Sequence, residues 1–143
     1  MSVEENKALI RRWDELWNAG DAAAIAALVT PDYVRHDPNG PEVRGPAAER
    51  QLVELYRAAF PDLRFTIEHL VADGDLVMAR VTVRGTHRGE LLGIPPTGTP
   101  LTLAAMELYR IRDGKVAEQW VALDALGLLQ QLGAVPTLGQ ADG

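Results

Sequence analysis

The stretch LTLAAMELYRIRDGKVAEQWVAL (residues 101–123) carries the clearest structural signal in the sequence. Two runs of alternating side chains flank the dipeptide Asp113-Gly114, which tolerates the positive φ angles of a tight hairpin turn. In the first run, one strand face carries Glu107 together with five apolar side chains, namely Leu101, Leu103, Ala105, Tyr109 and Ile111. Burying a lone carboxylate among apolar groups is costly unless the carboxylate is paired or used. Glu107 is therefore the first candidate for a functional residue.

The periodicity of the chain predicts an α+β domain. Helical spacing is expected at residues 2–20, 22–29, 46–60 and 125–132, and strands are expected at residues 65–71, 76–84, 101–111 and 115–123. Ser2 and Glu5 form the Ser-x-x-Glu pattern that begins a helix, and Gly20 can end it. Thr30-Pro31-Asp32 predicts a break, followed by a strand stub and a loop up to Arg44. Helices that precede a run of strands indicate helices packed on an antiparallel sheet.

Length and composition indicate one domain at residues 1–135 and a flexible C-terminal tail at residues 136–143. The net charge of −6 and the absence of a Lys/Arg cluster argue against a nucleic-acid partner. No apolar run approaches the roughly 20 residues that cross a bilayer, and the acidic N-terminus lacks the features of a secretory signal, so we expect a cytoplasmic protein without a membrane partner. Ser2 is the only serine, which excludes a serine hydrolase, and the chain has no cysteine.

Several motifs together resemble the SnoaL-like polyketide cyclase (ester cyclase) family. They are Tyr33 to Pro38, Ala59 to Leu63, Gly85-Thr86-His87, Gly93 to Thr97, Tyr109-Arg110-Ile111 with Asp113-Gly114-Lys115, and Asp124 to Gly133. The resemblance covers residues 6–133. It implies the cone-shaped fold of nuclear transport factor 2, ring closure by intramolecular aldol chemistry with no cofactor and no metal, and association into a homodimer or higher homo-oligomer through the sheet.

The resemblance also bears on individual positions. In the cyclases of this family an aspartate in the last long strand serves as acid/base, and a histidine in the preceding strand assists it. Counting back from Asp124, the aspartate position falls on Val121, and the histidine position falls on Glu107. Both motif residues are therefore replaced in this chain.

Glu107 is the candidate catalytic base. A carboxylate in an apolar cavity has a raised pKa, which suits proton abstraction beside a carbonyl group. The alternative is a glutamate that pairs with Arg80 or Arg84, or that points out of the sheet. A turn at Asp113–Gly114 places Glu107 opposite position 120, or opposite 119 or 121 after a slip of one residue, and such a slip exchanges the two faces. The family alignment favours Gln119 pointing inward, where it could donate a hydrogen bond to a substrate oxygen or hold Glu107.

His36 is the other candidate catalytic partner, because a histidine near a carboxylate, here Asp37, can shuttle protons. The alternative is a His-Asp pair that organises its loop. The remaining expected substrate contacts form an apolar wall with a few polar members, and they are Trp13, Trp17, Tyr33, Tyr56, Phe60, His87 and Val121. For Trp13 and Trp17 simple core packing is the competing interpretation.

Together these residues predict a cofactor-free acid/base enzyme that acts on a mostly apolar, oxygenated small molecule by aldol cyclisation or a related isomerisation or hydrolysis. The alternative is a non-catalytic ligand-binding or accessory domain. The two differ in the pocket, because a binding pocket can be wholly apolar, whereas a catalytic pocket needs polar groups that converge inside it.

Overall fold

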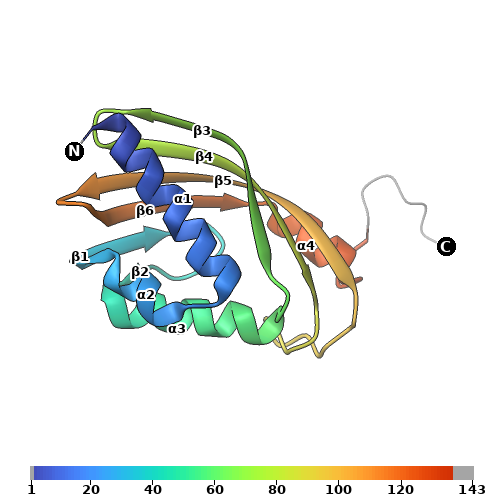
Figure 1. The fold of residues 1–143 in the computed structure, drawn as a ribbon. Coiled ribbons are helices and arrows are strands. Elements are labelled where there is room, and N and C mark those ends of the chain that lie inside the picture. Colours follow the sequence, from blue (N-terminus) through green and yellow to red (C-terminus); the bar gives the residue numbers. More distant parts are fainter. Residues whose placement is uncertain (1, 137–143) are drawn as a thin grey trace.

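The computed structural model describes residues 2–136. Figure 1 shows helices packed against one curved, open sheet. The elements in chain order are α1 (Val3–Ala19), α2 (Ala22–Ala27), β1 (Val29–His36), β2 (Val43–Arg44), α3 (Gly45–Ala59), β3 (Arg64–Asp73), β4 (Leu76–Thr86), β5 (Pro100–Arg112), β6 (Lys115–Leu123) and α4 (Ala125–Gln131). The α+β class is therefore confirmed. Residues 137–143 of the expected tail lie outside the described residues.

The sheet has six strands in the order β2-β1-β6-β5-β4-β3. Its strands pair antiparallel except at one place, because β1 runs parallel to β6. That parallel pair was not expected from the sequence, and neither was the length of β1. The strand runs through Pro31, where a break was predicted, and its register shifts between Val29 and Val34. A proline that cannot donate a ladder hydrogen bond is accommodated at such an irregularity.

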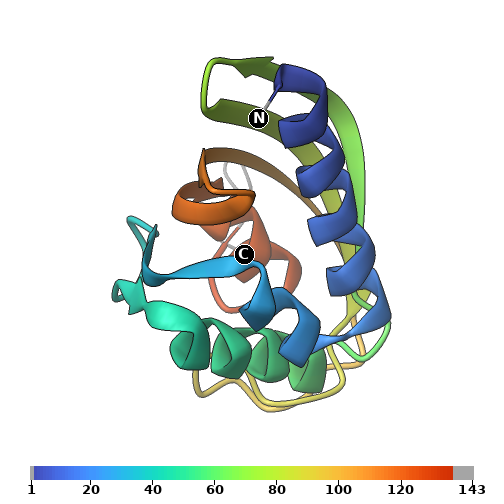
Figure 2. The same cartoon turned by 60° about the vertical axis from the view of Figure 1, so that its left-hand side comes forward.

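The helix boundaries follow the local signals. Ser2 and Glu5 make both hydrogen bonds of a capping box, and Gly20 ends α1 with φ of 70°. Asp21 caps α2 through the amide of Ala24, but α2 ends at Ala27 instead of continuing to residue 29, because Val29 already belongs to β1. The first three helices lie on the concave side of the sheet, where α1 packs against β3 and α3 packs against α2 and β1 (Figures 1 and 2).

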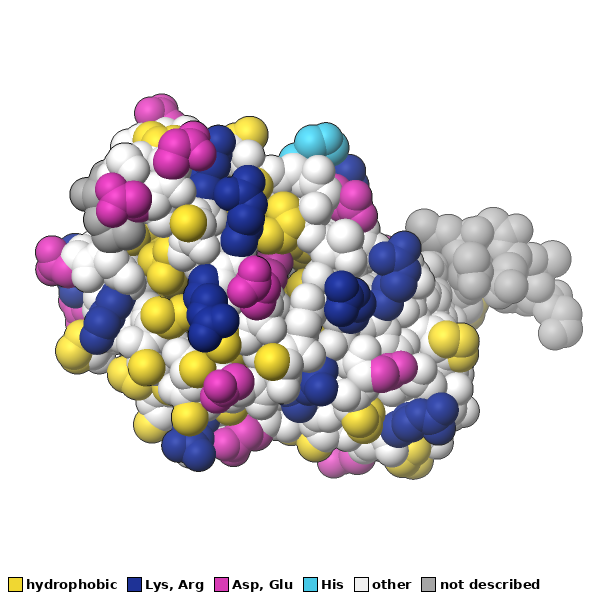
Figure 3. Space-filling model, viewed as in Figure 1, with side chains coloured by type: hydrophobic (Ala, Val, Ile, Leu, Met, Phe, Trp, Pro, Cys, Tyr) yellow, Lys and Arg dark blue, Asp and Glu magenta, His cyan; other side chains and the backbone are white. Residues whose placement is uncertain are grey.

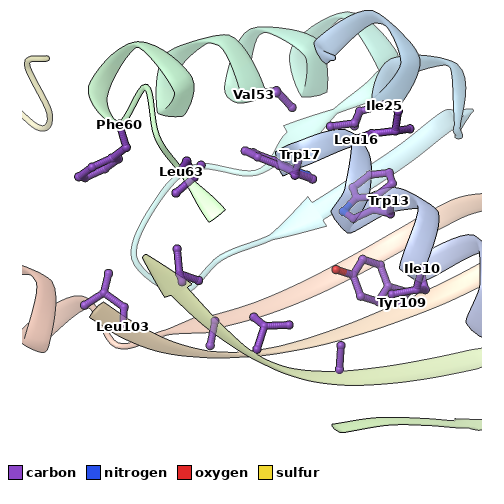
Figure 4. Close-up of a cluster of buried hydrophobic side chains, with 14 of the residues drawn as sticks. Ile10, Trp13, Leu16, Trp17, Ile25, Val53, Phe60, Leu63, Leu103 and Tyr109 are labelled. Carbon is purple, nitrogen blue, oxygen red and sulfur yellow. The ribbon is translucent and has the colours of Figure 1, made fainter. Parts of the chain in front are cut away.

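The hydrophobic core fills the space between these helices and the sheet. Figure 4 shows Trp13 and Tyr109 side by side, with Ile10 and Ile25 nearby. Trp13 meets Tyr109 edge-on at a ring-centroid distance of 5.9 Å, a geometry that aromatic pairs prefer. Trp17, one turn further along α1, meets Phe65 of β3 in the same way at 5.3 Å. Two aromatic pairs thus fix α1 against the sheet, which in turn fixes the side chains that α1 directs inward.

A bulge in β6 sets the register of the site. Near the turn Ile111 pairs with Val116, but further along Arg110 pairs with Glu118, so that Ala117 is an extra residue in β6. Val116 and Ala117 are accordingly both buried. A bulge bends a strand and increases its twist, which contributes to the concave sheet. Beyond the bulge Tyr109 lies opposite Gln119, and both face the helices.

The surface over the helices carries Lys and Arg side chains interspersed with Asp and Glu, and apolar groups lie between them (Figure 3). On this face no region of a single charge sign dominates. In residues 2–136 no helix combines the length and the apolar character needed to cross a membrane.

Candidate active site

A pocket opens on the concave side of the sheet. Its cavity volume is about 70 Å³. The lining residues come from three helices, five strands and one loop, and they are Trp17, Arg35, Tyr56, Phe60, Leu63, Phe65, Val83, Leu103, Ala105, Glu107, Gln119, Val121, Leu123 and Leu128. Most of them are apolar. The exceptions are Arg35, Glu107 and Gln119, together with the hydroxyl group of Tyr56.

Glu107 projects from β5 into this pocket and is only 7% exposed. The hydroxyl group of Tyr109, two residues along the same strand face, donates a hydrogen bond of 2.7 Å to Glu107 Oε2. Neither Arg80 nor Arg84 pairs with it, because both project from the other face of β4, where Arg80 Nε donates to His69 Nδ1. Glu107 is therefore a buried carboxyl group held by one neutral donor.

Burial raises the pKa of Glu107, while the hydrogen bond from Tyr109 and the positive charge of Arg35 oppose the increase. A second buried acid, Asp14, interacts with Glu107. Asp14 on α1 is also buried, its Oδ2 has no hydrogen-bond partner among the described residues, and burial together with the charge of Glu107 raises its pKa to about 8. Two acids that repel each other in a dry site do not ionise together easily, so near neutral pH this pair retains a proton.

Arg35 supplies positive charge at the pocket. It lies in β1 beside Gln119 of β6, and its guanidinium Nη1 is 3.6 Å from Asp37 Oδ2. Its charge lowers the pKa values of Glu49, Glu107 and Tyr56 relative to what burial alone would give. Arg35 can therefore stabilise negative charge that develops on a bound molecule.

Gln119 lies at the inner end of a chain of polar groups. Tyr33 Oη is 2.9 Å from Gln119 Oε1 and 3.1 Å from Glu49 Oε2. Glu49, on α3, is completely buried, and its other oxygen, Oε1, has no partner among the described residues. Burial raises the pKa of Glu49 to about 7.

The structure divides the expected wall residues into two groups. Trp17, Tyr56, Phe60 and Val121 line the pocket. Trp13 and Tyr33 do not, because both are fully enclosed in the core, where their rings lie 6.5 Å apart. For Trp13 the packing interpretation is the one that the structure supports. Tyr33 reaches the pocket only through its hydrogen bond to Gln119.

The structure does not bring His36 to the pocket. Side chains of β1 alternate, so Tyr33 and Arg35 point inward and His36 points to the outer face of the sheet. There its ring stacks on Trp120 at 5.5 Å, and its Nε2 lies 2.6 Å from Glu118 Oε2. His36 therefore lies on the opposite face of the sheet from Glu107 and is not part of the candidate site.

His87 is buried next to the pocket wall, in the connection between β4 and β5. Its ring packs against Phe60 at 5.8 Å, and its Nδ1 accepts a hydrogen bond from the amide of Thr97. The amides of Arg88 and Gly89 both donate to the carbonyl oxygen of Ala59 at the end of α3. His87 therefore organises this connection and supports Phe60 instead of lining the pocket.

Sequence reasoning missed three charged residues of the site. Asp14 lies four residues after Ile10 and three before Trp17, so it belongs to the buried stripe of α1. Glu49 likewise lies four residues before Val53 on α3. For Asp14 and Glu49 the sequence did contain a signal of a functional residue, because each is a carboxylate on an otherwise apolar helix face. Arg35 shares a strand face with Tyr33, but the expected break at Pro31 concealed that alternation. Within residues 2–136 no three His, Asp or Glu side chains are arranged to hold a metal ion.

Comparison with known proteins identifies the family. The model of the SnoaL-like polyketide cyclase family matches residues 7–132. The chain belongs to the SnoaL-like polyketide cyclase family. It is 32% identical over 128 residues to the aklanonic acid methyl ester cyclase DnrD of Streptomyces peucetius, which covers 87% of this chain and 88% of that protein. It is also 32% identical over 119 residues to the nogalonic acid methyl ester cyclase of Streptomyces nogalater, covering 82% of this chain and 89% of that protein.

Two solved structures share the fold. The crystal structure of AclR from Streptomyces galilaeus, a proposed hydroxylase, has a TM-score of 0.87 and 35% identity, and the match covers 97% of this chain and 87% of that chain. The structure of IdmH from Streptomyces antibioticus, a proposed polyketide cyclase, has a TM-score of 0.77 and 33% identity over 90% of this chain and 98% of that chain. The expected family and its cone-shaped fold are thereby confirmed. The comparisons also support a cyclase-type enzyme over the non-catalytic alternative.

Proposed function

We propose that this protein catalyses an aldol-type ring closure on a polyketide-like substrate, with Glu107 as the base. The observation that carries the proposal is the Glu107 carboxyl group, which lies in a mostly apolar pocket with a raised pKa and a fixed orientation. These are the properties that a general base needs in order to act near neutral pH. Glu107 occupies the position at which the family's assisting histidine is expected.

In this reaction Glu107 takes one proton from the substrate and later returns one proton to it. Glu107 removes a proton from a carbon that lies beside a carbonyl group, and the resulting enolate carbon attacks a ketone carbon of the same molecule to form the new C–C bond. The ketone oxygen becomes an alkoxide, which takes the proton from Glu107. Substrate and product are isomers, and the carboxylate is regenerated.

Two polar groups at the pocket can stabilise the oxygen that becomes negative. Arg35 carries the positive charge, and Gln119, its neighbour on β6, offers an amide. Such preorganised groups are worth most in a site from which water is excluded. The apolar wall of Trp17, Tyr56 and Phe60 suits a flat ring system. The cavity is smaller than the roughly 300 Å³ at the lower end of ligand sites, so we expect the wall to open when substrate binds.

The curated relatives indicate which substrates to try. Aklanonic acid methyl ester and nogalonic acid methyl ester appear in the names of relatives that are 32% identical to this chain. We expect the purified protein to convert at least one of them to a product of unchanged mass with a new ring, which can be followed by liquid chromatography and mass spectrometry. Recovery of unchanged substrate from both incubations would contradict the proposed substrate class.

Hydroxylation is a second candidate reaction, because AclR is a proposed hydroxylase and is 35% identical to this chain. The same experiment separates the two reactions. Cyclisation leaves the mass unchanged, whereas hydroxylation adds the mass of one oxygen atom and requires an oxidant. The buried acid pair of Asp14 and Glu107 favours proton transfer.

We further propose that the protein acts in the cytoplasm as a homo-oligomer that associates through the outer face of the sheet. Three outer-face side chains, Val71, Met106 and Trp120, support this arrangement, since the first two are exposed and Trp120 is partly exposed. Light scattering of the purified protein distinguishes a monomer from a dimer.

A further inference from the structure

The hydroxyl group of Tyr33 lies between two oxygen atoms but has only one proton to donate. Its Oη is 3.1 Å from Glu49 Oε2 and 2.9 Å from Gln119 Oε1, and all three side chains are buried. If Tyr33 donates to one of these oxygens, the contact with the other requires a donor on the partner. A proton on Glu49 meets that requirement. Glu49 then donates to Tyr33, and Tyr33 donates to Gln119.

The free oxygen of Glu49 supports the same assignment. Glu49 Oε1 is buried without a hydrogen-bond partner among the described residues. An ionised carboxylate would leave part of its charge on that buried atom without a hydrogen-bond donor. A protonated carboxyl group leaves only a neutral carbonyl oxygen unpaired, which costs much less.

The direction of this chain determines what Gln119 presents to the pocket. With Oε1 turned toward Tyr33, the amide nitrogen Nε2 has no hydrogen-bond partner among residues 2–136, and Gln119 lines the pocket. When Glu49 loses its proton, Tyr33 must donate to Glu49. The Tyr33 oxygen then accepts from Nε2 of a rotated amide, and Oε1 faces the pocket instead.

We propose that the proton on Glu49 sets the orientation of the Gln119 amide through Tyr33, so that the pocket offers an N–H donor to a carbonyl or enolate oxygen while Glu49 is protonated. Glu49 is thus a positioning residue for Gln119. The inference deepens the proposed function and rests on it only for the role of the pocket. Ionisation of Glu49 replaces the donor by an acceptor, which disfavours a ketone substrate.

The charged and titratable groups around Glu49 define the direction of the pH effect. Tyr33 and Arg35 face it from β1, and Glu107 acts on it from β5. Burial raises the pKa of Glu49 to about 7, Arg35 and Tyr33 lower it, and Glu107 raises it. The donor arrangement is therefore present below about pH 7 and is lost as the pH rises through that value.

Nuclear magnetic resonance of the Gln119 side-chain amide tests the inference without substrate. In the wild-type protein we expect the two amide proton signals to shift with pH, with a midpoint near 7. Glu49→Gln keeps a neutral side chain at all pH values, so the shift should disappear. Tyr33→Phe breaks the chain while retaining the ring, and it serves as a second variant should Glu49→Gln fail to fold. Gln119 signals that do not move with pH in the wild type, or that still move in both folded variants, would overturn the inference.

Binding of 1-tetralone supplies a second readout, because this bicyclic ketone accepts hydrogen bonds and does not titrate. Its affinity for the wild type should fall by about fivefold between pH 6 and 8.5, the value of one hydrogen bond. Glu49→Gln should bind it equally at both pH values.

Glu107→Gln should retain the pH dependence, which separates the effect of Glu49 from the ionisation of Glu107. If Glu107→Gln abolishes the dependence and Glu49→Gln leaves it, Glu107 is the controlling group and the inference is wrong. The pH response of the Gln119 signals does not depend on whether Glu107 acts as the base. The inference about Glu49 and the proposed function can therefore fail separately.

Discussion

Glu107 lies directly opposite Val121 in the β5–β6 pair, and both side chains line the pocket. The extra residue at Ala117 produces this pairing. Without the bulge, the turn at Asp113–Gly114 would pair Glu107 with Trp120. In the observed sheet Trp120 lies on the outer face instead, and Val121 faces the pocket beside Glu107. We propose that these two facing positions correspond to the family's assisting histidine and acid/base aspartate, which this chain replaces with Glu107 and Val121.

Val121→Asp should restore a carboxyl group at that position and raise the pKa of Glu107, because two adjacent buried carboxylates repel each other. We expect the acidic limb of the profile of kcat/KM against pH to move upward by about one unit or more. Val121→Asn is the matched neutral control and should leave the limb in place. Equal shifts in the two variants would show that charge is not the cause.

Tyr109→Phe removes the hydrogen bond that Glu107 accepts. Since this bond favours the ionised carboxylate, its loss should raise the pKa of Glu107 and move the acidic limb of kcat/KM to higher pH. Met106→Leu, at an exposed position on the other face of the same strand, is the control. A limb that moves to lower pH would mean that Tyr109 does not act on Glu107 in this way.

Asp14→Asn should stabilise the protein at high pH. Burial raises the pKa of Asp14 in the folded state to about 8, above its value in the unfolded chain. The folded state therefore binds the proton more tightly, and stability is lost as the pH rises from about 4 through 8. Above pH 8 the variant should exceed the wild type in free energy of unfolding by at least about 1 kcal/mol, and this excess should be clearly smaller at pH 5, which is closer to the pKa of Asp14 in the unfolded chain. Urea unfolding at both pH values measures this, and a variant that is less stable at high pH would contradict the assignment.

Gly89→Ala should detach the β4–β5 connection from α3. A Cβ atom at position 89 would overlap the carbonyl oxygen of Ala58, which is backbone and cannot move aside easily. We expect the free energy of unfolding to fall by about 1–3 kcal/mol. Gly40→Ala is the control, because a Cβ atom there meets nothing within 4 Å. Equal stability of the two variants would show that the close approach at Gly89 has no energetic consequence.

Local sequence signals predicted most of the fold. The capping box at Ser2, the left-handed Gly20 and the turn at Asp113–Gly114 each act through neighbouring residues, so their outcome is visible in the sequence. The parallel pairing of β1 with β6 could not be predicted in this way, because it joins segments far apart in the chain.

The site was less predictable, because its residues come from segments that are far apart in the chain. Periodicity alone identified Glu107 as an acid on an apolar face, and its inward direction agrees with that pattern. His36 was misplaced because the strand continues through Pro31, which fixes the alternation and turns the ring outward. Asp14 and Glu49 lie on helices that the fold brings to the sheet, and only the tertiary structure shows their proximity to Glu107.

The proposed role of Glu107 as the base can be tested by single-turnover conversion of the methyl ester substrate with the variant Glu107→Gln. Glutamine keeps the shape of the side chain and its hydrogen bond to Tyr109 but cannot take a proton near neutral pH. We expect a rate at least about 100-fold below that of the wild type, with substrate affinity and the unfolding transition retained. A folded variant that closes the ring at the wild-type rate would contradict this role of Glu107.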